Sequence, residues 1–527
     1  MSWLERFVAF FLPLGIGLYV LISTYFGGDL SLLPGDLGDT RFNLFILEHC
    51  YQYFTGAVDQ FWNSGFMYPE AEVISLSDNL LGSAPIYSFF RLIGLDIFSA
   101  FQWWVLALSV LNYVCAYLLV VYLSKKSWFS GIAAFVFAFS LGLAAQMNHA
   151  QTFPRFAIPL TLLFLFLWKD KMHWKWFFLS ITSLTYTFYC GIYLGFMTFI
   201  PFVVMFSIIL YSKWNLFIAE IKTLRNKLIY LSAIVVNLFL LYILFAPYLR
   251  RSKSNPIHDY HYVKESIPTI ESYLSAHPGT LIHTPIENFI GGDQVAFWDH
   301  WLFSGWLATL GLAVMIILTF KKRLIERTNF NTQNTRILMI TGLITFILFL
   351  RIGDYSLYYF LYQLPGFGAM RALERIINIE LLFFGIGLAF ILTLIANKLR
   401  NYKIFVFIFV LPLLIIDNSI DPASANTTSK EVMKERHQKL VKKMEDIPKG
   451  EVVSYEPDLN NLNTHIVHYQ LDAMLAAQSL GLKSVNGYSA QAAYMFDRYW
   501  REPNPENRAY WFSRFPEVSG DDVYIVH

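Results

Sequence analysis

Charged residues are scarce in this chain, and their scarcity excludes an ordinary soluble protein. Of its 527 residues, 15% are charged and 56% are hydrophobic. A soluble protein of this size does not need so much apolar surface to form its core. The hydrophobic residues gather in nearly uncharged runs of about 20 residues, the length that a helix needs to cross a bilayer. The composition therefore predicts a polytopic membrane protein.

Cysteine is also rare, and so are the usual signatures of soluble catalytic sites. The three cysteines, Cys50, Cys115 and Cys190, lie far apart and form no metal-binding or redox pattern, so we expect buried structural thiols. The sequence lacks a glycine-rich phosphate loop after a strand, a Walker pattern, zinc-ligand spacing and a serine nucleophile elbow. It offers no recognisable nucleotide-sugar site, and we expect no nucleic-acid partner.

About eleven hydrophobic runs are candidate membrane spans. They cover roughly residues 7–26, 98–124, 129–147, 154–168, 175–190, 192–212, 228–248, 300–320, 336–351, 376–396 and 403–418. The first run is too long for a signal peptide and no small-residue cleavage site follows it. We therefore expect it to remain as a membrane anchor.

The distribution of charge predicts the orientation of these spans. Every second predicted loop is rich in lysine and arginine, and the intervening loops carry aspartates. Basic loops remain on the cytoplasmic side of a membrane. The alternation therefore predicts a cytoplasmic N-terminus and places the first loop, residues 27–97, outside the cytoplasm.

The composition changes near residue 420, which suggests two domains. Residues 1–419 carry the spans, whereas residues 420–527 are more polar and contain short strand-like and helix-like segments. This second part is long enough for a modest core. The predicted fold is an all-α polytopic membrane domain followed by a small extracytoplasmic α/β domain.

The first outer loop contains two carboxylates, Asp36 and Asp39, in a glycine-rich segment. The segment from about residue 40 to 55 has the pattern of an amphipathic helix lying along the membrane surface, with Arg41, Glu48, Gln52 and Thr55 on one face. Two interpretations of the carboxylates remain open. They could be catalytic, or Asp39 could cap the helix while Asp36 serves as a turn residue.

The sequence resembles the class C glycosyltransferases, and in particular a bacterial branch of that superfamily. The matching stretches are residues 35–43, 61–63 with 68–69, 77–82, 148–151 with 159–160, 303–306, 364–367 with Arg371 and Arg375, and 485–489. The resemblance implies polytopic enzymes that take a sugar from a polyprenyl-phosphate carrier. It also implies a catalytic aspartate after the first span, next to a helix lying along the membrane.

In a glycosyl transfer the acceptor hydroxyl must lose a proton, and a nearby carboxylate can act as the general base. We expect Asp39 to be this base, with Asp36 as the second choice, and a direct displacement would invert the anomeric centre. Alternatively, the pair could hold a divalent cation such as Mg²⁺ or Mn²⁺, because such cations prefer oxygen ligands.

Other residues are candidates for binding the donor phosphate or the acceptor. Arg155, Arg371 and Arg375 lie at predicted outer ends of spans, where arginine could contact a lipid phosphate or merely anchor to headgroups. The remaining candidates are Arg41, Asp78, His149, Asn486 and Tyr488. Each has a structural alternative, such as helix capping for Asp78, helix termination for His149 and a simple turn for Asn486.

These observations favour a glycosyltransferase of the bacterial cytoplasmic membrane that works at the extracytoplasmic face. Its partners would be membrane lipids, a polyprenyl-phosphate sugar donor, and an envelope glycan, lipid or protein as acceptor. Two alternatives remain: a lipid or sugar transporter or flippase, and a non-catalytic scaffold with the same fold. A transporter should show ionisable residues at mid-membrane and repeat symmetry, neither of which is evident here.

Overall fold

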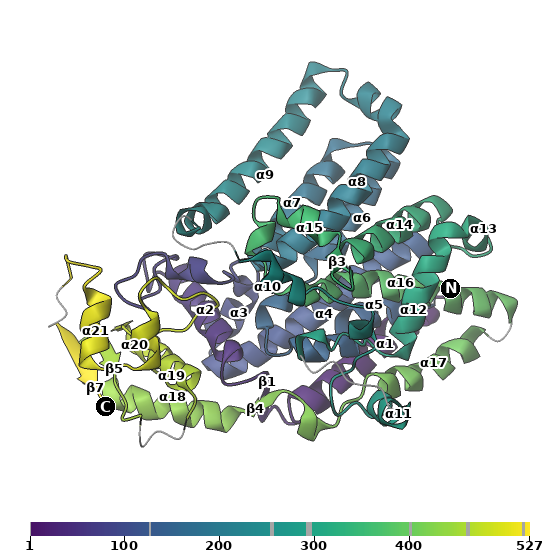
Figure 1. Ribbon diagram of the computed structural model, residues 1–527. Coiled ribbons are helices and arrows are strands. Elements are labelled where there is room, and N and C mark those ends of the chain that lie inside the picture. Colours follow the sequence, from purple (N-terminus) through teal and green to yellow (C-terminus); the bar gives the residue numbers. More distant parts are fainter. Residues whose placement is uncertain are drawn as a thin grey trace.

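The computed structural model describes residues 2–125, 128–252, 258–290, 298–399, 403–459, 464–518 and 522–527. It shows a helical bundle with a smaller C-terminal part at one end (Figure 1). The long helices of the bundle are α1 (Trp3–Tyr25), α4 (Ile97–Ser124), α5 (Ser130–Phe139), α6 (Ala157–Lys171), α7 (Trp174–Cys190), α8 (Ile192–Glu220), α9 (Leu224–Arg251), α12 (Trp306–Phe320), α14 (Thr332–Leu348), α16 (Ile377–Lys398) and α17 (Lys403–Asp417).

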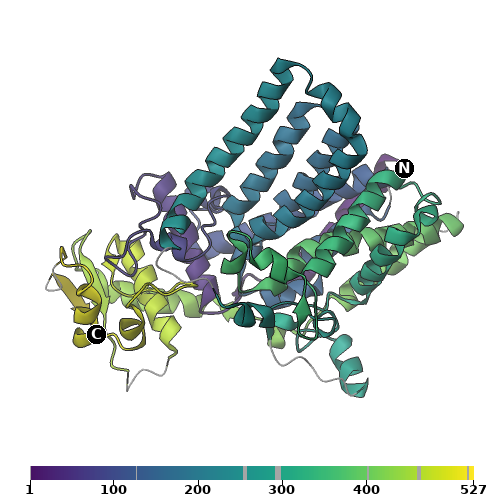
Figure 2. The same ribbon diagram turned by 45° about the horizontal axis from the view of Figure 1, so that its top comes forward.

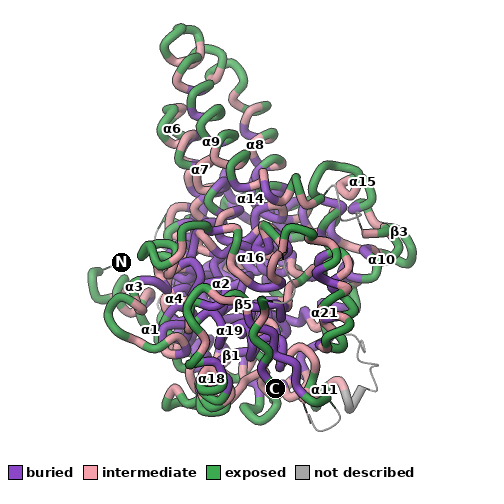
Figure 3. Tube along the Cα trace, turned by 90° about the vertical axis from the view of Figure 1, so that its left-hand side faces the viewer, coloured by how far each residue is buried: buried purple, intermediate pink, exposed green. Residues whose placement is uncertain are grey.

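Helix α16 lies at the centre of the bundle and is buried along most of its length (Figure 3). Glycines allow its neighbours to approach closely. A Cβ at Gly385 would lie 2.4 Å from the Ala133 carbonyl oxygen of α5, and one at Gly387 would lie 2.2 Å from the Gly311 carbonyl oxygen of α12. Small residues at helix contacts are typical of membrane bundles. Helices α8 and α9 project from this body (Figure 2), and most of α9 is exposed.

The number of membrane spans differs from the prediction. All eleven predicted runs contain helix, but among the described residues only six helical stretches are long and apolar enough to cross a membrane. They include α1, α4, α6, α8, α9 and α16, and three shorter apolar helices occupy 130–146, 306–320 and 404–417. The chain is an integral membrane protein. The count of eleven is not supported because the remaining helices, such as α7 and α14 with 17 residues each, are short.

Short elements connect the long helices. Before α4 come β1 (Leu32–Pro34), α2 (Asp39–Phe54), η1 (Val73–Leu76) and α3 (Ala84–Leu92), and before α6 come η2 (Leu141–Gln146) and η3 (Ala150–Thr152). Between α9 and α16 lie α10 (Tyr260–Glu265), η4 (Glu271–Tyr273), α11 (His283–Ile290), η5 (Trp298–His300), α13 (Lys322–Ile325), β2 (Arg351–Ile352), β3 (Tyr355–Ser356), α15 (Tyr358–Tyr362), η6 (Phe367–Ala369) and η7 (Leu373–Ile376).

The C-terminal part is an α/β unit built on a three-stranded parallel sheet. The strands β5 (Val452–Tyr455), β6 (Lys483–Ser484) and β7 (Val523–Val526) have the order β6-β5-β7. Its other elements are η9 (Pro422–Ser424), β4 (Thr427–Ser429), α18 (Lys430–Met444), α19 (Ile466–Leu480), α20 (Asp497–Arg501) and α21 (Pro505–Phe512). Strand β4 pairs with β1 in antiparallel fashion, which ties this part to the first loop.

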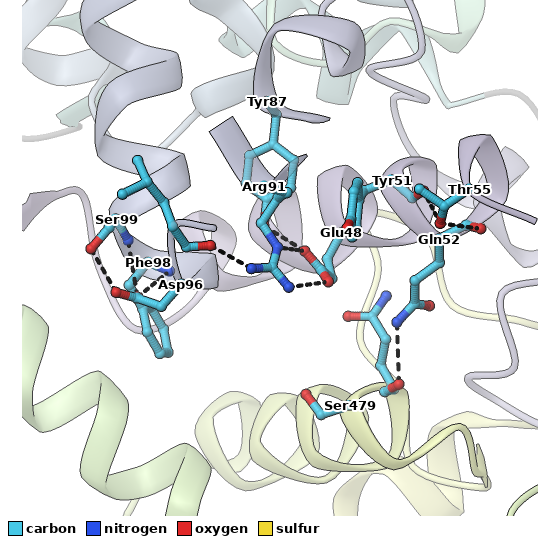
Figure 4. A network of polar contacts seen from close by, with 12 residues as sticks. Glu48, Tyr51, Gln52, Thr55, Tyr87, Arg91, Asp96, Phe98, Ser99 and Ser479 are labelled. Carbon is cyan, nitrogen blue, oxygen red and sulfur yellow. Dashed lines mark hydrogen bonds and ion pairs between the residues drawn. The ribbon is translucent and has the colours of Figure 1, made fainter. Parts of the chain in front are cut away.

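Helix α2 begins where the sequence predicts a helix, but protein covers it on more than one side. Its residues from Thr40 to Cys50 are buried, and it packs against α3, α4 and α19. The predicted polar face makes specific contacts. Glu48 accepts hydrogen bonds from Tyr87 at 2.7 Å and from Arg91 at 2.8 Å, as Figure 4 shows.

A buried ion pair joins α2 to the C-terminal part. The Arg41 guanidinium pairs with the Asp472 carboxylate of α19 and donates to the His468 carbonyl at 3.1 Å. Arg436 of α18 approaches the same carboxylate at 3.2 Å. Asp472 therefore compensates two positive charges that folding removes from water.

Asp472→Asn should destabilise the protein by about 3–5 kcal/mol, because it leaves two arginines without a counter-charge at a buried contact. Thermal unfolding of the purified protein measures this loss, and proteolysis of the C-terminal part should become faster. Asp446→Asn, at an exposed position of the same part, is the matched control. Equal melting temperatures for Asp472→Asn and the control would show that this contact does not hold the two parts together.

Candidate functional site

A glycine sets the turn of the loop before α2, and the Asp36 side chain caps the start of that helix. Gly35 has a φ of 94°, and a Cβ there would collide with the Thr40 side chain. Asp36 Oδ1 accepts from the backbone N–H groups of Gly38 at 3.0 Å and Thr40 at 3.4 Å. Of the structural roles that the sequence left open, Asp36 is a turn residue, but Asp39 does not cap the helix. Gly38 is the N-cap residue without a side-chain bond of its own, and the Asp36 carboxylate satisfies the helix start.

Because Asp36 serves the helix start, the Asp39 carboxylate is available for other partners. The Tyr488 hydroxyl donates to Asp39 Oδ1 at 2.6 Å, and His149 Nδ1 lies 3.0 Å from Asp39 Oδ2. The His149 ring stacks on Trp298, with the ring centroids 5.4 Å apart. Three distant segments, the first loop, the η2–η3 connection and the C-terminal part, thus meet at one carboxylate.

The surroundings of Asp39 favour an ionised carboxylate beside a neutral histidine. Burial by itself raises the pKa of Asp39, but its contact with His149, the hydrogen bond from Tyr488 and the charge of Arg375 outweigh it, so the net pKa is below its usual value. Burial, and then the charge of Arg375, lowers the pKa of His149. A neutral imidazole with its proton on Nδ1 can donate to the Asp39 carboxylate.

Two arginines contribute positive charge to the site: the charge of Arg375 acts on Asp39, and the charge of Arg371 acts on His149 and Tyr488. The Arg375 guanidinium lies over the Tyr193 ring, 4.9 Å from its centroid, and its Nε is 3.9 Å from the buried Glu374 carboxylate. The Arg371 backbone N–H donates to the Tyr193 hydroxyl at 3.0 Å, and its side chain, which is exposed, donates to the Ala490 carbonyl at 2.8 Å. The site thus contains exposed or half-buried positive charge next to an ionised base.

Two further carboxylates surround Arg375. Asp78 is buried and accepts from the Ile192 N–H at 2.5 Å, at the first turn of α8. Burial raises its pKa, and the charge of Arg375 opposes that rise. Burial also raises the pKa of Asp299 to about 6. Sequence reasoning counted Asp299 only as one acidic loop residue and missed its place in the site, because that place depends on contacts across the bundle.

Three predicted site residues have structural partners away from Asp39. Arg41 belongs to the ion pair with Asp472, and Arg155 is buried in the bundle with Asn378 as a hydrogen-bond acceptor. Asn486 bonds the backbone of Tyr455 in both directions, at 2.7 and 3.0 Å. Of the predicted C-terminal pair, Tyr488 contacts Asp39 directly, while Asn486 supports the strand beside it.

The proposed cation site remains a prediction. Asp36 and Asp39 supply the oxygen atoms that Mg²⁺ or Mn²⁺ prefers. Across the described part of the chain, however, no three histidine, cysteine, aspartate or glutamate side chains converge in a metal-binding group.

The lowered pKa of His149 gives a pH dependence with a defined sign. Below the ordinary histidine pKa of 6.5, His149 binds a proton in the unfolded state, whereas in the folded state its lowered pKa keeps it neutral to lower pH. Stability should fall with acidification, and His149→Gln should reduce that slope by up to about 1.4 kcal/mol per pH unit. Melting temperatures across the pH range measure it, with the exposed His261→Gln as control. An unchanged slope in His149→Gln would contradict a neutral, buried His149.

Comparisons with known proteins show what this architecture resembles. No family model matches the chain, and no curated protein matches it by sequence. The archaeal oligosaccharyltransferase AglB from Archaeoglobus fulgidus, in complex with an inhibitory peptide and a dolichol-phosphate, matches with a TM-score of 0.53 at 12% identity, over 97% of this chain and 69% of AglB. The apo form of the Archaeoglobus fulgidus oligosaccharyltransferase matches with a TM-score of 0.54 at 12% identity, over 98% and 69%. The chain therefore shares the fold of these oligosaccharyltransferases, which is a fold of the kind that the resemblance in its motifs implies.

Proposed function

We propose that this protein is a glycosyltransferase that moves a sugar from a polyprenyl-phosphate donor to an acceptor. The observation that carries the proposal is the Asp39 carboxylate. It is relieved of helix capping by Asp36, oriented by Tyr488 and His149, and close enough to Arg375 for their charges to interact. The likeness to a fold whose solved example binds a dolichol-phosphate and a peptide supports a lipid-phosphate donor.

In this proposal Asp39 is the general base. An ionised carboxylate has about four acceptor positions. The Tyr488 hydroxyl occupies one of them, and His149 Nδ1 lies 3.0 Å from the other oxygen. A remaining lone pair can take the proton of the acceptor hydroxyl as the acceptor oxygen bonds to the anomeric carbon. The bond from that carbon to the phosphate oxygen breaks in the same step. One displacement of this kind inverts the anomeric centre.

The leaving lipid phosphate carries negative charge away from the sugar. Arg371 and Arg375 can stabilise it, because guanidinium groups form bidentate hydrogen bonds with phosphate oxygens. The Tyr193 ring, over which the Arg375 guanidinium lies, orients Arg375. A divalent cation held by Asp36 and Asp39 would add positive charge at the same phosphate.

The alternation of basic loops supports an active site on the extracytoplasmic side of the membrane, with the N-terminus in the cytoplasm. The resemblance to a bacterial branch supports a bacterial cytoplasmic membrane. An envelope glycan, a lipid and a protein all present the hydroxyl or amide nucleophile that such a site needs. A transfer assay with each of these acceptors would therefore identify the acceptor class.

Asp39→Asn should reduce sugar transfer by a factor of about 10²–10⁴, the usual contribution of a positioned general base. The assay follows transfer of a labelled sugar from polyprenyl-phosphate donors in membranes that contain the full chain. Asp29→Asn, an exposed aspartate in the same loop, is the control and should retain activity. Transfer by Asp39→Asn at the wild-type rate, with unchanged protein levels, would exclude Asp39 as the base.

Arg375→Met should lower kcat/KM for the lipid-linked donor by a factor of about 10² or more, because the variant loses charge stabilisation of the leaving phosphate. Arg375→Lys should recover part of this loss, since it restores charge without the bidentate geometry. Steady-state kinetics with varied donor and fixed acceptor measure the effect. A change confined to the acceptor KM would assign Arg375 to the acceptor instead.

A further inference from the structure

A groove lies between α8, α13 and α14, at the end of the bundle where α14 begins (Figure 1). It has a volume of about 510 Å³. Ile208 of α8 and Ile337 and Ile340 of α14 form its apolar wall, and these side chains are buried or half-buried. Lys322 of α13 and Arg336 of α14 also line it, and both are exposed. The groove therefore joins an apolar wall to two exposed cations.

A polar hollow adjoins this groove at the first turn of α14. Thr332 and Gln333 line both of them. The polar hollow has a volume of about 500 Å³, and most of its other lining residues are polar, among them Lys125 at the end of α4, Asn329 and Asn331. The two spaces thus lie side by side with opposite character. A phospholipid has the same division between its headgroup and its acyl chains.

The groove lies where the apolar part of α8 ends. Helix α8 departs from helical geometry at Lys213. Tyr211 and Trp214, on either side of this point, are 89% and 52% exposed. Tyrosine and tryptophan are enriched at the boundary between membrane and water, because their rings are apolar and carry one polar group. The groove and the polar hollow therefore lie at the level expected for lipid headgroups.

The charge balance favours a negatively charged occupant. Among the described residues that line the two spaces, three are cations and one, Glu326, is a carboxylate. Glu326 lies 3.5 Å from Lys322 Nζ, and both side chains are about half exposed, so their attraction is weak. Arg336 and Lys125 form no ion pair with a carboxylate of the described segments. An excess of positive charge therefore remains for a ligand.

We propose that the groove and the polar hollow together bind one phospholipid of net negative charge. Its phosphate would contact Arg336, which can form two parallel hydrogen bonds with phosphate oxygens, and Lys322. An acyl chain would cover the isoleucines of the groove, and the rest of the headgroup would enter the polar hollow. A zwitterionic lipid carries a cation of its own and gains less from this surplus of positive charge. This inference does not depend on the proposed function.

Native mass spectrometry of the purified full chain tests this site. With equal amounts of phosphatidylglycerol and phosphatidylcholine of the same acyl chains, the wild type should retain more of the anionic lipid. Lys322→Gln combined with Arg336→Gln should lower this preference by about fivefold for each cation removed. Lys439→Gln combined with Lys442→Gln, which removes two exposed charges of α18, is the control and should leave the preference unchanged. An equal decrease in both double variants, or no preference in the wild type, would overturn the proposal.

A structure of the wild type in nanodiscs that contain phosphatidylglycerol provides a test that does not depend on the folding of a variant. The expected result is phospholipid density with its phosphate beside Lys322 and Arg336 and an acyl chain along Ile337 and Ile340. Excess inorganic phosphate should not displace this lipid, because a free anion leaves the apolar wall uncovered. An empty groove, or displacement by phosphate alone, would overturn the proposal.

Discussion

The candidate site depends on two aspartates, three residues apart, that have different partners: Asp36 bonds the backbone and Asp39 bonds side chains. Asp36 accepts the backbone N–H groups at the start of α2, which are the groups that a helix leaves unsatisfied. Asp39 is thereby available to interact with Tyr488 and His149. The turn at Gly35, which only glycine accommodates without collision, makes this arrangement possible.

The C-terminal part is structurally required for the site as it stands. It contributes the Tyr488 hydroxyl, and three separate contacts hold it against the bundle: the pairing of β1 with β4, the ion pair between Arg41 and Asp472, and the mutual bonds between α2 and Gln478. Each of these contacts involves the segment that also carries Asp39. The position of Tyr488 and the position of Asp39 are therefore coupled through α2.

Much of the fold follows from local sequence signals. The apolar runs predicted the long helices well, and the helix after Asp39 begins within one residue of the expected position. The number of spans could not be predicted in the same way, because hydropathy does not reveal where a helix is interrupted. One such interruption is at Ser140, between α5 and η2. The burial of α2 by other parts of the protein was not predictable either, because an apolar helix face can pack against lipid or against another helix such as α19.

For the site, the sequence indicated the acidic loop, His149, Tyr488 and the two arginines, but not the contacts that join them. Asp299 and Tyr193 became visible only through their places around Arg375. Arg155 was predicted to bind phosphate because it lies near an expected span end, and Arg41 was a further candidate on the helix that follows the acidic loop. In the structure their guanidinium groups point to Asp472 and Asn378, partners that are 431 and 223 residues away in the chain. Long-range pairing of this kind leaves no local pattern in the sequence.

The most direct measurement of the central claim is an electron cryomicroscopy structure of the full chain in lipid nanodiscs with polyprenyl phosphate. The account predicts density for the phosphate against the guanidinium groups of Arg371 and Arg375, on the side of the site that faces Asp39. A phosphate bound away from both arginines, or no specific binding of the lipid at all, would contradict it.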